Sequence, residues 1–332
     1  MFSLFRMFGG NRSPRVRIIG TIIIIALYGA RLWYRSNPWI GNSALRESAE
    51  IDKTVVMNTV SKSAKGQEVA PGVIRTQLTY KKANHTRTIW VYVPQNSQGK
   101  KFPVILMGPA GTRLFHGTGL GQGDMKEELP YTSEGFAVVA YSLDGNLEEE
   151  DITSNKKVVQ AATEFRNAQA GVLDGRDALD IVLAKFPQLD KNRVYAAGHS
   201  SAATLALNLA AYEPRIKGCL AYCACTDILS RLTPDGDSTM IKDIGKSIPN
   251  YESFLKAHSP IEIANKIKCP VFLFASKADD NVPYTESETL AQKLKSTNSN
   301  VTLKLVSSGD HYTSMIEAGI PAGIAWLKQR GK

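Results

Sequence analysis

Short, continuous apolar runs alternate with longer segments of helical length over most of the chain. Such runs are typical of strands covered on both faces, and their alternation with helices is typical of a parallel sheet between two helical layers. We therefore predict an α/β fold with a mostly parallel central sheet and helices on both faces. The predicted core strands are residues 104–107, 137–140, 194–197, 220–222, 271–274 and 301–306, and the predicted helices are residues 168–185, 202–212, 284–296 and 313–328.

Two more strands are predicted ahead of this alternation. Residues 73–80 and 88–93 flank a polar turn, which indicates a β-hairpin. Residues 36–70 are polar and lack sustained periodicity, so we expect a linker or stalk there. The folded domain is then residues 71–332, and the stretch 228–258 between two strands is long enough for a small cap.

The N-terminal part of the chain follows a different pattern. Residues 18–30 are an uncharged apolar run, and the 17 residues 18–34 contain a single charge, Arg31. As a helix at ~1.5 Å per residue they span about 25 Å, slightly less than a hydrocarbon core of about 30 Å. We predict that residues 1–35 are a leader with a single N-terminal membrane helix. A cleaved signal peptide and an organelle transit peptide stay open as alternatives.

The formal net charge of +9, from 40 basic and 31 acidic residues, is concentrated in this leader. Seven arginines precede Glu47, the first acidic residue, so residues 47–332 hold 33 basic and 31 acidic side chains. A nucleic-acid-binding protein would carry its basic residues on the folded domain, so we expect no nucleic-acid partner. Four arginines precede the apolar run, which predicts a cytoplasmic N-terminus and an extracytoplasmic domain.

The four cysteines indicate neither a disulfide framework nor a metal site. They are too few for a disulfide scaffold, and they lack the paired spacing of zinc ligands. We expect reduced, buried thiols and no metal, although the sequence leaves open whether the first and last of them pair; the four are Cys219, Cys223, Cys225 and Cys269.

A predicted strand turns sharply into an Ala- and Leu-rich helix at Gly198-His199-Ser200-Ser201-Ala202. A nucleophile elbow requires small residues two positions before and after the nucleophile, because strand and helix cross closely there. Gly198 and Ala202 meet that requirement. The turn would expose the Ser200 hydroxyl, offer the Ser201 N–H to an oxyanion, and pack His199 beside it. The alternative is that Ser200 only caps the helix.

Two later segments complete the order nucleophile, acid, base. After the predicted strand 271–274 comes Asp279-Asp280-Asn281-Val282-Pro283, and after the last strand comes Gly309-Asp310-His311. With these segments the sequence resembles the α/β-hydrolase superfamily, and residues 259–294 resemble the catalytic domain of prolyl oligopeptidase and dienelactone hydrolase relatives. The resemblance covers about residues 73–328. It implies Asp279 as the acid and His311 as the base, with Asp280 or Asp227 as alternative acids.

The same resemblance implies a second oxyanion donor in the loop that follows residues 104–107. Pro109 has no N–H, so the donor carries over to Ala110. Relatives have His-Gly where this chain has Gly108-Pro109, and a second glycine where it has Ala202. These departures concern the oxyanion geometry and the substrate more than the triad.

Together these patterns predict a serine hydrolase that works through a Ser200 acyl-enzyme without metal or organic cofactor. We expect an acyl ester or short peptide as substrate and favour carboxylic esters, because neither the oxyanion-loop tyrosine nor the gating domain usual in prolyl oligopeptidase relatives is evident. The alternatives are a serine peptidase and a non-catalytic binding module of the same fold. No residue pattern specifies the acyl group or the alcohol.

Overall fold

The structure is a computed structural model of the 332-residue chain. It describes residues 59–61, 66–82, 85–95, 99, 101–121, 125–232, 237–298 and 300–330, without the side chains of residues 237–240. The predicted leader and membrane helix, residues 1–35, lie outside the described residues. Among the helices that are described, none combines the length and the apolar character needed to cross a bilayer.

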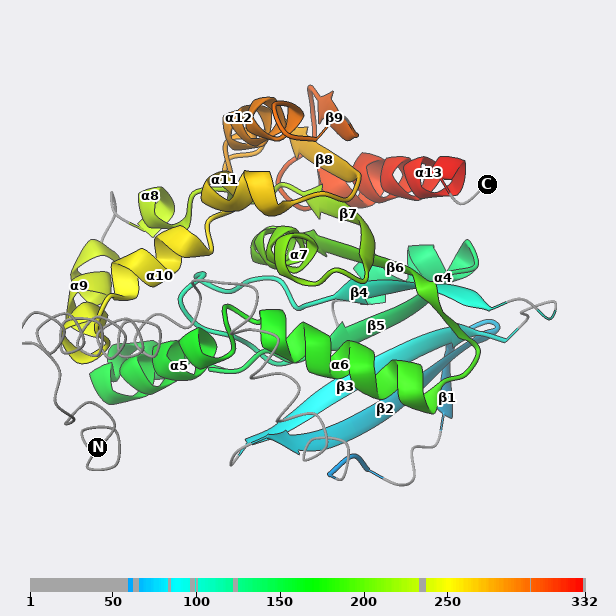
Figure 1. The fold of residues 1–332 in the computed structure, drawn as a ribbon, viewed down its shortest axis with the longest axis horizontal. Coiled ribbons are helices and arrows are strands. Elements are labelled where there is room, and N and C mark those ends of the chain that lie inside the picture. The colour runs from blue at the N-terminus through cyan, green and yellow to red at the C-terminus, as the bar shows by residue number, and fades with distance from the viewer. Residues whose placement is uncertain are drawn as a thin grey trace, which may run out of the picture. The chain divides into compact units, whose positions relative to one another are not determined.

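Nine strands of the described chain form one sheet, in the order β1-β2-β3-β5-β4-β6-β7-β8-β9 (Figure 1). Strands β4 to β9 pair in parallel, whereas β1, β2 and β3 are antiparallel to their neighbours. The predicted mostly parallel α/β sheet is therefore confirmed. The strands are Gly66–Ala70 (β1), Val73–Lys82 (β2), His85–Pro94 (β3), Phe102–Met107 (β4), Ala137–Tyr141 (β5), Leu189–His199 (β6), Ile216–Tyr222 (β7), Val271–Ser276 (β8) and Val301–Val306 (β9).

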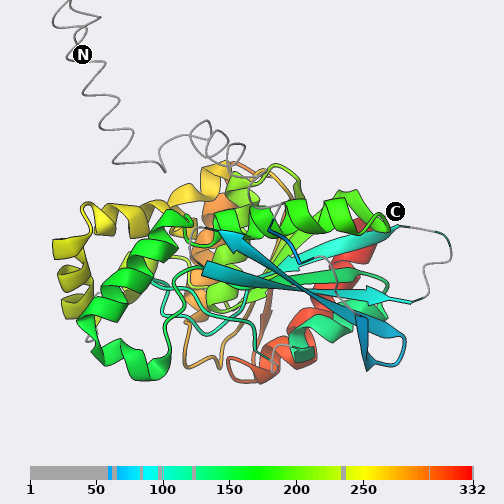
Figure 2. The same cartoon turned by 90° about the horizontal axis from the view of Figure 1, so that it is seen from below.

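Helices cover both faces of this sheet, as Figures 1 and 2 show. Helices α4 and α13 contact each other on one face, while α6, α7 and α12 pack against strands on the other. Helices α8, α9 and α10 occupy the segment for which a cap was predicted. The helices are Met125–Ser133 (α4), Asn155–Asn167 (α5), Val172–Lys185 (α6), Ser201–Tyr212 (α7), Ile228–Leu232 (α8), Asp237–Ser247 (α9), Tyr251–Ala257 (α10), Pro260–Ile263 (α11), Tyr284–Lys295 (α12) and Ile320–Arg330 (α13), with shorter turns at Glu149–Thr153, Ala264–Lys266 and Met315–Gly319.

Buried aromatic side chains fill the space between the sheet and the α4–α13 layer. Tyr222, Phe272 and Phe274 from the strands pack with Tyr131 of α4 and Trp326 of α13 in one cluster. The two tyrosine hydroxyls lie 2.6 Å apart, so each buried polar group has a partner. Packing of this kind holds the strand ends, from which the loops of the site emerge, in fixed positions.

Several elements differ from those predicted. Strand β1 extends the sheet into the segment expected to be a linker, so the sheet begins at Gly66 and not at residue 71. The predicted helix 168–185 is α6, which begins four residues later, at Val172, because Gln169, Ala170 and Gly171 adopt positive φ. Helix α5 ahead of it was not among the predicted helices. The predicted helix 313–328 opens with a π-helical turn, Met315–Gly319, before α13.

Candidate active site

Ser200 lies between the end of β6 and the start of α7. Its backbone conformation is one that residues other than glycine rarely adopt. Its φ is 55° and its ψ is −124°. For a residue other than glycine this conformation costs energy and persists only where surrounding structure holds it. The N–H of Ser200 donates to the carbonyl of Tyr222 at the end of β7 (2.9 Å), which anchors the turn to the neighbouring strand.

The close crossing of β6 and α7 explains the small residues around Ser200. A Cβ on Gly198 would lie 2.3 Å from the carbonyl oxygen of Ala202 and 2.4 Å from its carbonyl carbon. Both are backbone atoms, so no side-chain rotation would relieve the clash. The sequence pattern at these two positions therefore reflects the approach of the two main chains.

His311 and Asp279 form a hydrogen-bonded pair at the carboxyl edge of the sheet. The Nδ1–H of His311 donates to Oδ2 of Asp279 at 2.7 Å, and the carboxylate is fully buried. The other oxygen, Oδ1, accepts the N–H groups of Asn281 and Val282, both at 2.9 Å. Burial alone would raise the pKa of Asp279, but these three hydrogen bonds outweigh it and hold the pKa below its ordinary value.

The imidazole of His311 lies beside the elbow. Its ring centroid is 4.5 Å from that of His199, the residue before Ser200. The Nε2 atom of His311 is buried and makes no hydrogen bond to any described residue, the Ser200 hydroxyl included. Catalytic hydrogen bonds in unliganded sites are often long and shorten when substrate binds, so this geometry is compatible with the predicted role of His311 as base.

The structure distinguishes the three carboxylates proposed as the acid. Asp280 is exposed, and Asp227 accepts the N–H of Ser230 at the start of α8. Neither is bonded to His311, whereas Asp279 is. Asp310, the residue before His311, is exposed and accepts the N–H groups of Tyr312 and Thr313 in its own turn.

The two predicted oxyanion donors lie on connected elements. Ser201 is the first residue of α7, where an N–H has no partner within the helix. Ala110 follows β4 in a loop that is bonded to the elbow, because the N–H of Thr112 donates to the Ser201 hydroxyl at 3.1 Å. The hydroxyl of Ser201 was not assigned a role from the sequence, and it holds the predicted oxyanion loop against α7.

His199 contacts His311 at atoms other than the nitrogen that Asp279 binds. Its Nε2–H donates to the carbonyl oxygen of His311 at 3.0 Å, and its Nδ1 lies 3.7 Å from Oε1 of Glu127 on α4. Burial and the neighbouring His311 lower the pKa of His199 to about 4, so this imidazole is neutral at pH 7. The prediction that His199 packs beside the elbow is confirmed, while the contact with Glu127 was not foreseen because the two lie 72 positions apart in the chain.

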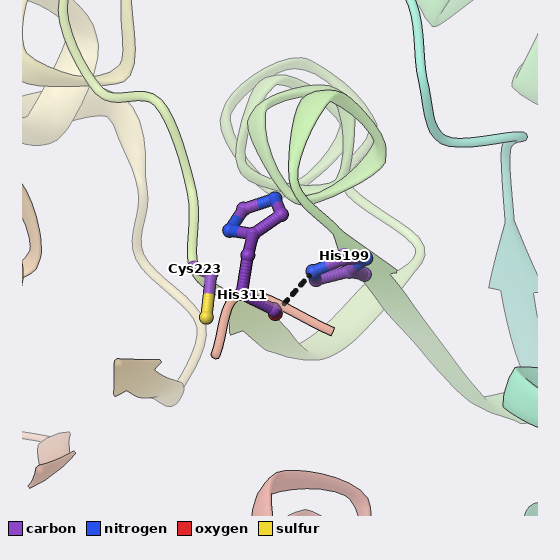
Figure 3. A group of neighbouring side chains, drawn as sticks. All are labelled: His199, Cys223 and His311. Atoms are coloured by element: carbon purple, nitrogen blue, oxygen red, sulfur yellow. Dashed lines mark hydrogen bonds between the residues drawn. The ribbon is translucent and has the colours of Figure 1, made fainter. Parts of the chain in front are cut away.

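Cys223 lies beside the pair, close to His199 and His311 (Figure 3). Donor atoms of His199, Cys223 and His311 lie within 4.8 Å of one another. Figure 3 shows the sulfur directed away from the His311 ring, and the ring nitrogens Nε2 of His199 and Nδ1 of His311 are already hydrogen-bonded. Burial and the Asp279 carboxylate raise the pKa of Cys223 to about 12, so its thiol stays protonated. All four cysteines are free thiols, and Cys219 is not paired with Cys269.

A cavity of about 270 Å³ opens at Ser200. The loop after β4 and the first residues of α7 form one wall, and α8 with the loop after β8 forms the other. Its lining is Gly111, Thr112, Arg113, Leu114, Ser200, Ser201, Cys225, Arg231, Leu232, Asn281 and Val282. The segment predicted as a cap therefore supplies part of the cavity wall through Arg231 and Leu232.

The sheet order, the elbow and the histidine loop after the last strand together define the α/β-hydrolase class. The prolyl oligopeptidase family model matches residues 127–328, more than half of the chain. The chain therefore belongs to the prolyl oligopeptidase family, whose members are serine hydrolases.

Similar proteins include both esterases and peptidases. An acetyl esterase of Xylanibacter ruminicola is 22% identical over 275 residues, which are 76% of this chain and 58% of that protein. Acetyl xylan esterase 1 from Thermoanaerobacterium has a TM-score of 0.61 at 14% identity, covering 86% of this chain and 92% of the esterase. The acylaminoacyl peptidase of Pyrococcus horikoshii has a TM-score of 0.60 at 17% identity, covering 81% of this chain and 41% of the peptidase. At these identities the structural matches establish the fold.

Proposed function

We propose that this chain hydrolyses carboxylic esters through a covalent Ser200 acyl-enzyme. The observation that carries the proposal is the hydrogen-bonded His311–Asp279 pair beside a serine at the sharp β6–α7 turn. Family membership supports the reaction class. The preference for esters rests on the acetyl esterases among the similar proteins and on the 92% coverage of one of them, against 41% for the peptidase.

In the first half of the reaction the Ser200 hydroxyl oxygen attacks the acyl carbon, and Nε2 of His311 takes the hydroxyl proton. Asp279 keeps the other nitrogen, Nδ1, protonated and stabilises the imidazolium that forms. The negative oxygen of the tetrahedral intermediate is stabilised by the N–H groups of Ser201 and Ala110. The bond to the alcohol then breaks, and His311 returns the proton to the departing oxygen.

In the second half a water molecule attacks the acyl-enzyme. His311 accepts a proton from the water, the carbonyl oxygen again carries the negative charge, and the bond to Ser200 breaks with return of the proton to the serine. The products are the carboxylic acid, the alcohol and the free enzyme.

The experiment that tests the proposal is labelling with a fluorophosphonate probe, which reacts with activated serines. The folded wild type should be labelled, and Ser200→Ala should lose labelling and ester hydrolysis while circular dichroism shows an unchanged fold. Ser133→Ala, at the exposed end of α4 and outside the cavity lining, serves as the matched control and should still be labelled. A folded wild type that is never labelled would favour the non-catalytic binding module instead.

A second assay separates esterase from peptidase. p-Nitrophenyl acyl esters and aminoacyl or prolyl p-nitroanilides release the same kind of chromophore and can be compared at equal concentration. We expect kcat/KM for short acyl esters to exceed that for the amides. The reverse order would assign the site to a peptidase.

For the part of the chain outside the described residues we propose a single membrane helix at residues 18–34, with the folded domain on the extracytoplasmic side. The apolar run and the arginines around it support this placement. N-terminal sequencing of the protein purified from membranes should find an intact leader, and protease added to intact cells or vesicles should reach the folded domain. An N-terminus that begins after the apolar run would show a cleaved signal instead.

A further inference from the structure

The cavity at Ser200 has a charge pattern that an ester hydrolase for neutral substrates does not need. Among the described residues that line it are two arginines, Arg113 and Arg231, and no aspartate or glutamate. The remaining lining is small, apolar or neutral. A pocket with basic groups and no acidic ones concentrates anions, and the effect is strongest close to low-dielectric walls such as Leu114 and Leu232.

Arg231 is held in place by a neutral partner. Its guanidinium donates from Nη2 to the side-chain oxygen of Asn281 at 2.7 Å, and no carboxylate of the described residues lies within ion-pair distance of it. Asn281 in turn sits in the loop that carries Asp279, so the α8 arginine is fixed relative to the proposed triad. An arginine oriented by an amide keeps its full charge and its remaining donors for a ligand.

Arg113 contributes a second, weaker charge. Its guanidinium lies 3.4 Å from Glu149, a carboxylate whose side chain is 88% exposed and well solvated. An exposed pair of this kind is worth little and is readily exchanged for another anion. On the cavity wall, burial and the carboxylates of Glu286 and Asp227 raise the pKa of the Cys225 thiol, and the charge of Arg231 opposes this shift.

The position of the cavity indicates which part of the ester it receives. His311 must reach the departing oxygen of the alcohol, and it is not among the residues that line the cavity. Ser200, Ser201 and the loop after β4, which face the acyl carbon and its oxygen, do line it. The cavity is therefore on the acyl side, and its volume of about 270 Å³ suits an acyl chain of a few carbon atoms.

We infer that the substrate carries a negative charge on its acyl part, as in the half-ester of a short dicarboxylic acid, and that Arg231, positioned by Asn281, binds this charge. The inference rests on the proposed ester hydrolysis at Ser200. Arg231 acts as a specificity-determining residue, and Arg113 adds to the field.

The test compares two esters of equal size that differ only in charge. Monoethyl succinate carries a carboxylate, and ethyl succinamate carries a neutral amide in its place. Hydrolysis is followed by pH-stat titration at low salt. The wild type should prefer monoethyl succinate about ten-fold in kcat/KM, a ratio that corresponds to one charge-assisted hydrogen-bonded contact. The preference should shrink at about 0.5 M salt, where the Debye length falls to about 4 Å.

Each variant is compared with the wild type by the ratio of kcat/KM for monoethyl succinate to kcat/KM for ethyl succinamate. Arg231→Gln should abolish the preference, and Arg231→Lys should retain part of it because the charge remains. Lys246→Gln is the matched control: Lys246 is an exposed cation on the neighbouring helix α9, pairs with Asp243, and does not line the cavity. It should leave the ratio unchanged. A wild-type ratio of one or less, or a ratio that survives Arg231→Gln, would overturn the inference.

A binding measurement separates failure of this inference from failure of the proposed function. Ser200→Ala cannot form an acyl-enzyme, so calorimetry with this variant measures binding alone. It should bind monoethyl succinate about ten-fold more tightly than ethyl succinamate, and the double variant with Arg231→Gln should bind them equally. Equal binding in the single variant contradicts the anionic subsite even if esters are hydrolysed. Selective binding without any hydrolysis by the wild type would keep the subsite and reject the esterase.

Discussion

At the scale of single residues, the site depends on how the neighbours of His311 orient it. Asp279 fixes one nitrogen of His311, and His199 holds the main chain of the same histidine through its carbonyl oxygen. Burial and the neighbouring His311 keep His199 neutral, so it donates through Nε2–H without placing a positive charge beside His311. His311 is thus held from two sides, with Nε2 left for the serine.

Asp279→Asn tests the orienting hydrogen bond. The amide can place an N–H against Nδ1 and so favour the wrong imidazole tautomer, with little change in volume. We expect kcat for a p-nitrophenyl ester to fall by about 10⁴, which is what the same substitution costs in a well-studied triad. The acidic limb of the stability profile should change as well. Because the folded-state pKa of Asp279 is lowered, its contribution to stability is present above about pH 3.9 and is lost as the pH falls through the folded-state value.

Asp280→Asn is the matched control for that experiment. The side chain is exposed and adjacent in sequence, and it is not bonded to His311. Its kcat should stay within about two-fold of the wild type, since surface substitutions away from special contacts have small effects. A larger loss in Asp280→Asn than in Asp279→Asn would reverse the assignment of the acid.

At the scale of secondary-structure elements, the close crossing of β6 and α7 determines the position of the Ser200 hydroxyl. The strand and the helix approach so closely that backbone atoms of Ala202 occupy the space where residue 198 would carry a side chain. This contact links a local sequence feature to the position of the nucleophile.

Gly198→Ala should therefore be strongly destabilising. The added Cβ would lie 2.3 Å from a backbone oxygen, and the only relief is a shift of β6 or α7. We expect a loss of about 3 kcal/mol or more in the free energy of unfolding, at the upper end of overpacking effects, measured by urea denaturation. Reactivity toward the fluorophosphonate probe should fall in any protein that remains folded.

Gly245→Ala provides the contrast, because Gly245 lies exposed in α9 and a Cβ added there would meet no atom within 4 Å. Alanine is the better helix former, so a gain of up to about 1 kcal/mol is expected. If both substitutions had the same effect on stability, the steric account of the elbow would be wrong.

The elements differ in how well their sequences reveal them. The core strands β4 to β9 were predicted because buried parallel strands need continuous apolar runs. Strand β1 was missed because its sequence, Gly66–Ala70, is polar and mostly exposed at the sheet edge. The boundary between α5 and α6 was missed because Gln169 and Ala170 adopt positive φ, which neither residue type indicates.

At the scale of the whole molecule, folding removes three histidines from water, His116, His199 and His258, and so couples stability to pH. Burial lowers the pKa values of His199 and His258 to about 4, against about 6.5 in an unfolded chain. Between these values the unfolded state binds more protons than the folded state. Stability is therefore complete above about pH 6.5 and decreases as the pH falls toward 4, by up to about 1.4 kcal/mol per pH unit for each histidine.

His258→Asn tests this coupling away from the site. Asparagine can replace the donor that Nδ1 provides to the carbonyl of Phe254 (2.8 Å), and it does not titrate. The free energy of unfolding, measured in urea at several pH values from 7.5 to 4.5, should depend less steeply on pH than in the wild type. Ile105→Val in the buried strand β4 removes packing but no titrating group, so it should lower stability equally at every pH. Parallel curves for wild type and His258→Asn would contradict the buried neutral state.

The sequence by itself determined the fold class and the chain order of Ser200, Asp279 and His311, because apolar runs and turn residues are local patterns that can be recognised in the sequence. It could not determine which groups meet across the molecule. The partnership of His199 with Glu127 and the placement of Arg231 against Asn281 depend on how loops from distant strands pack. Such contacts arise only when the sheet brings the carboxyl ends of its strands together. The charge of the cavity at Ser200 was therefore determined by the tertiary structure alone.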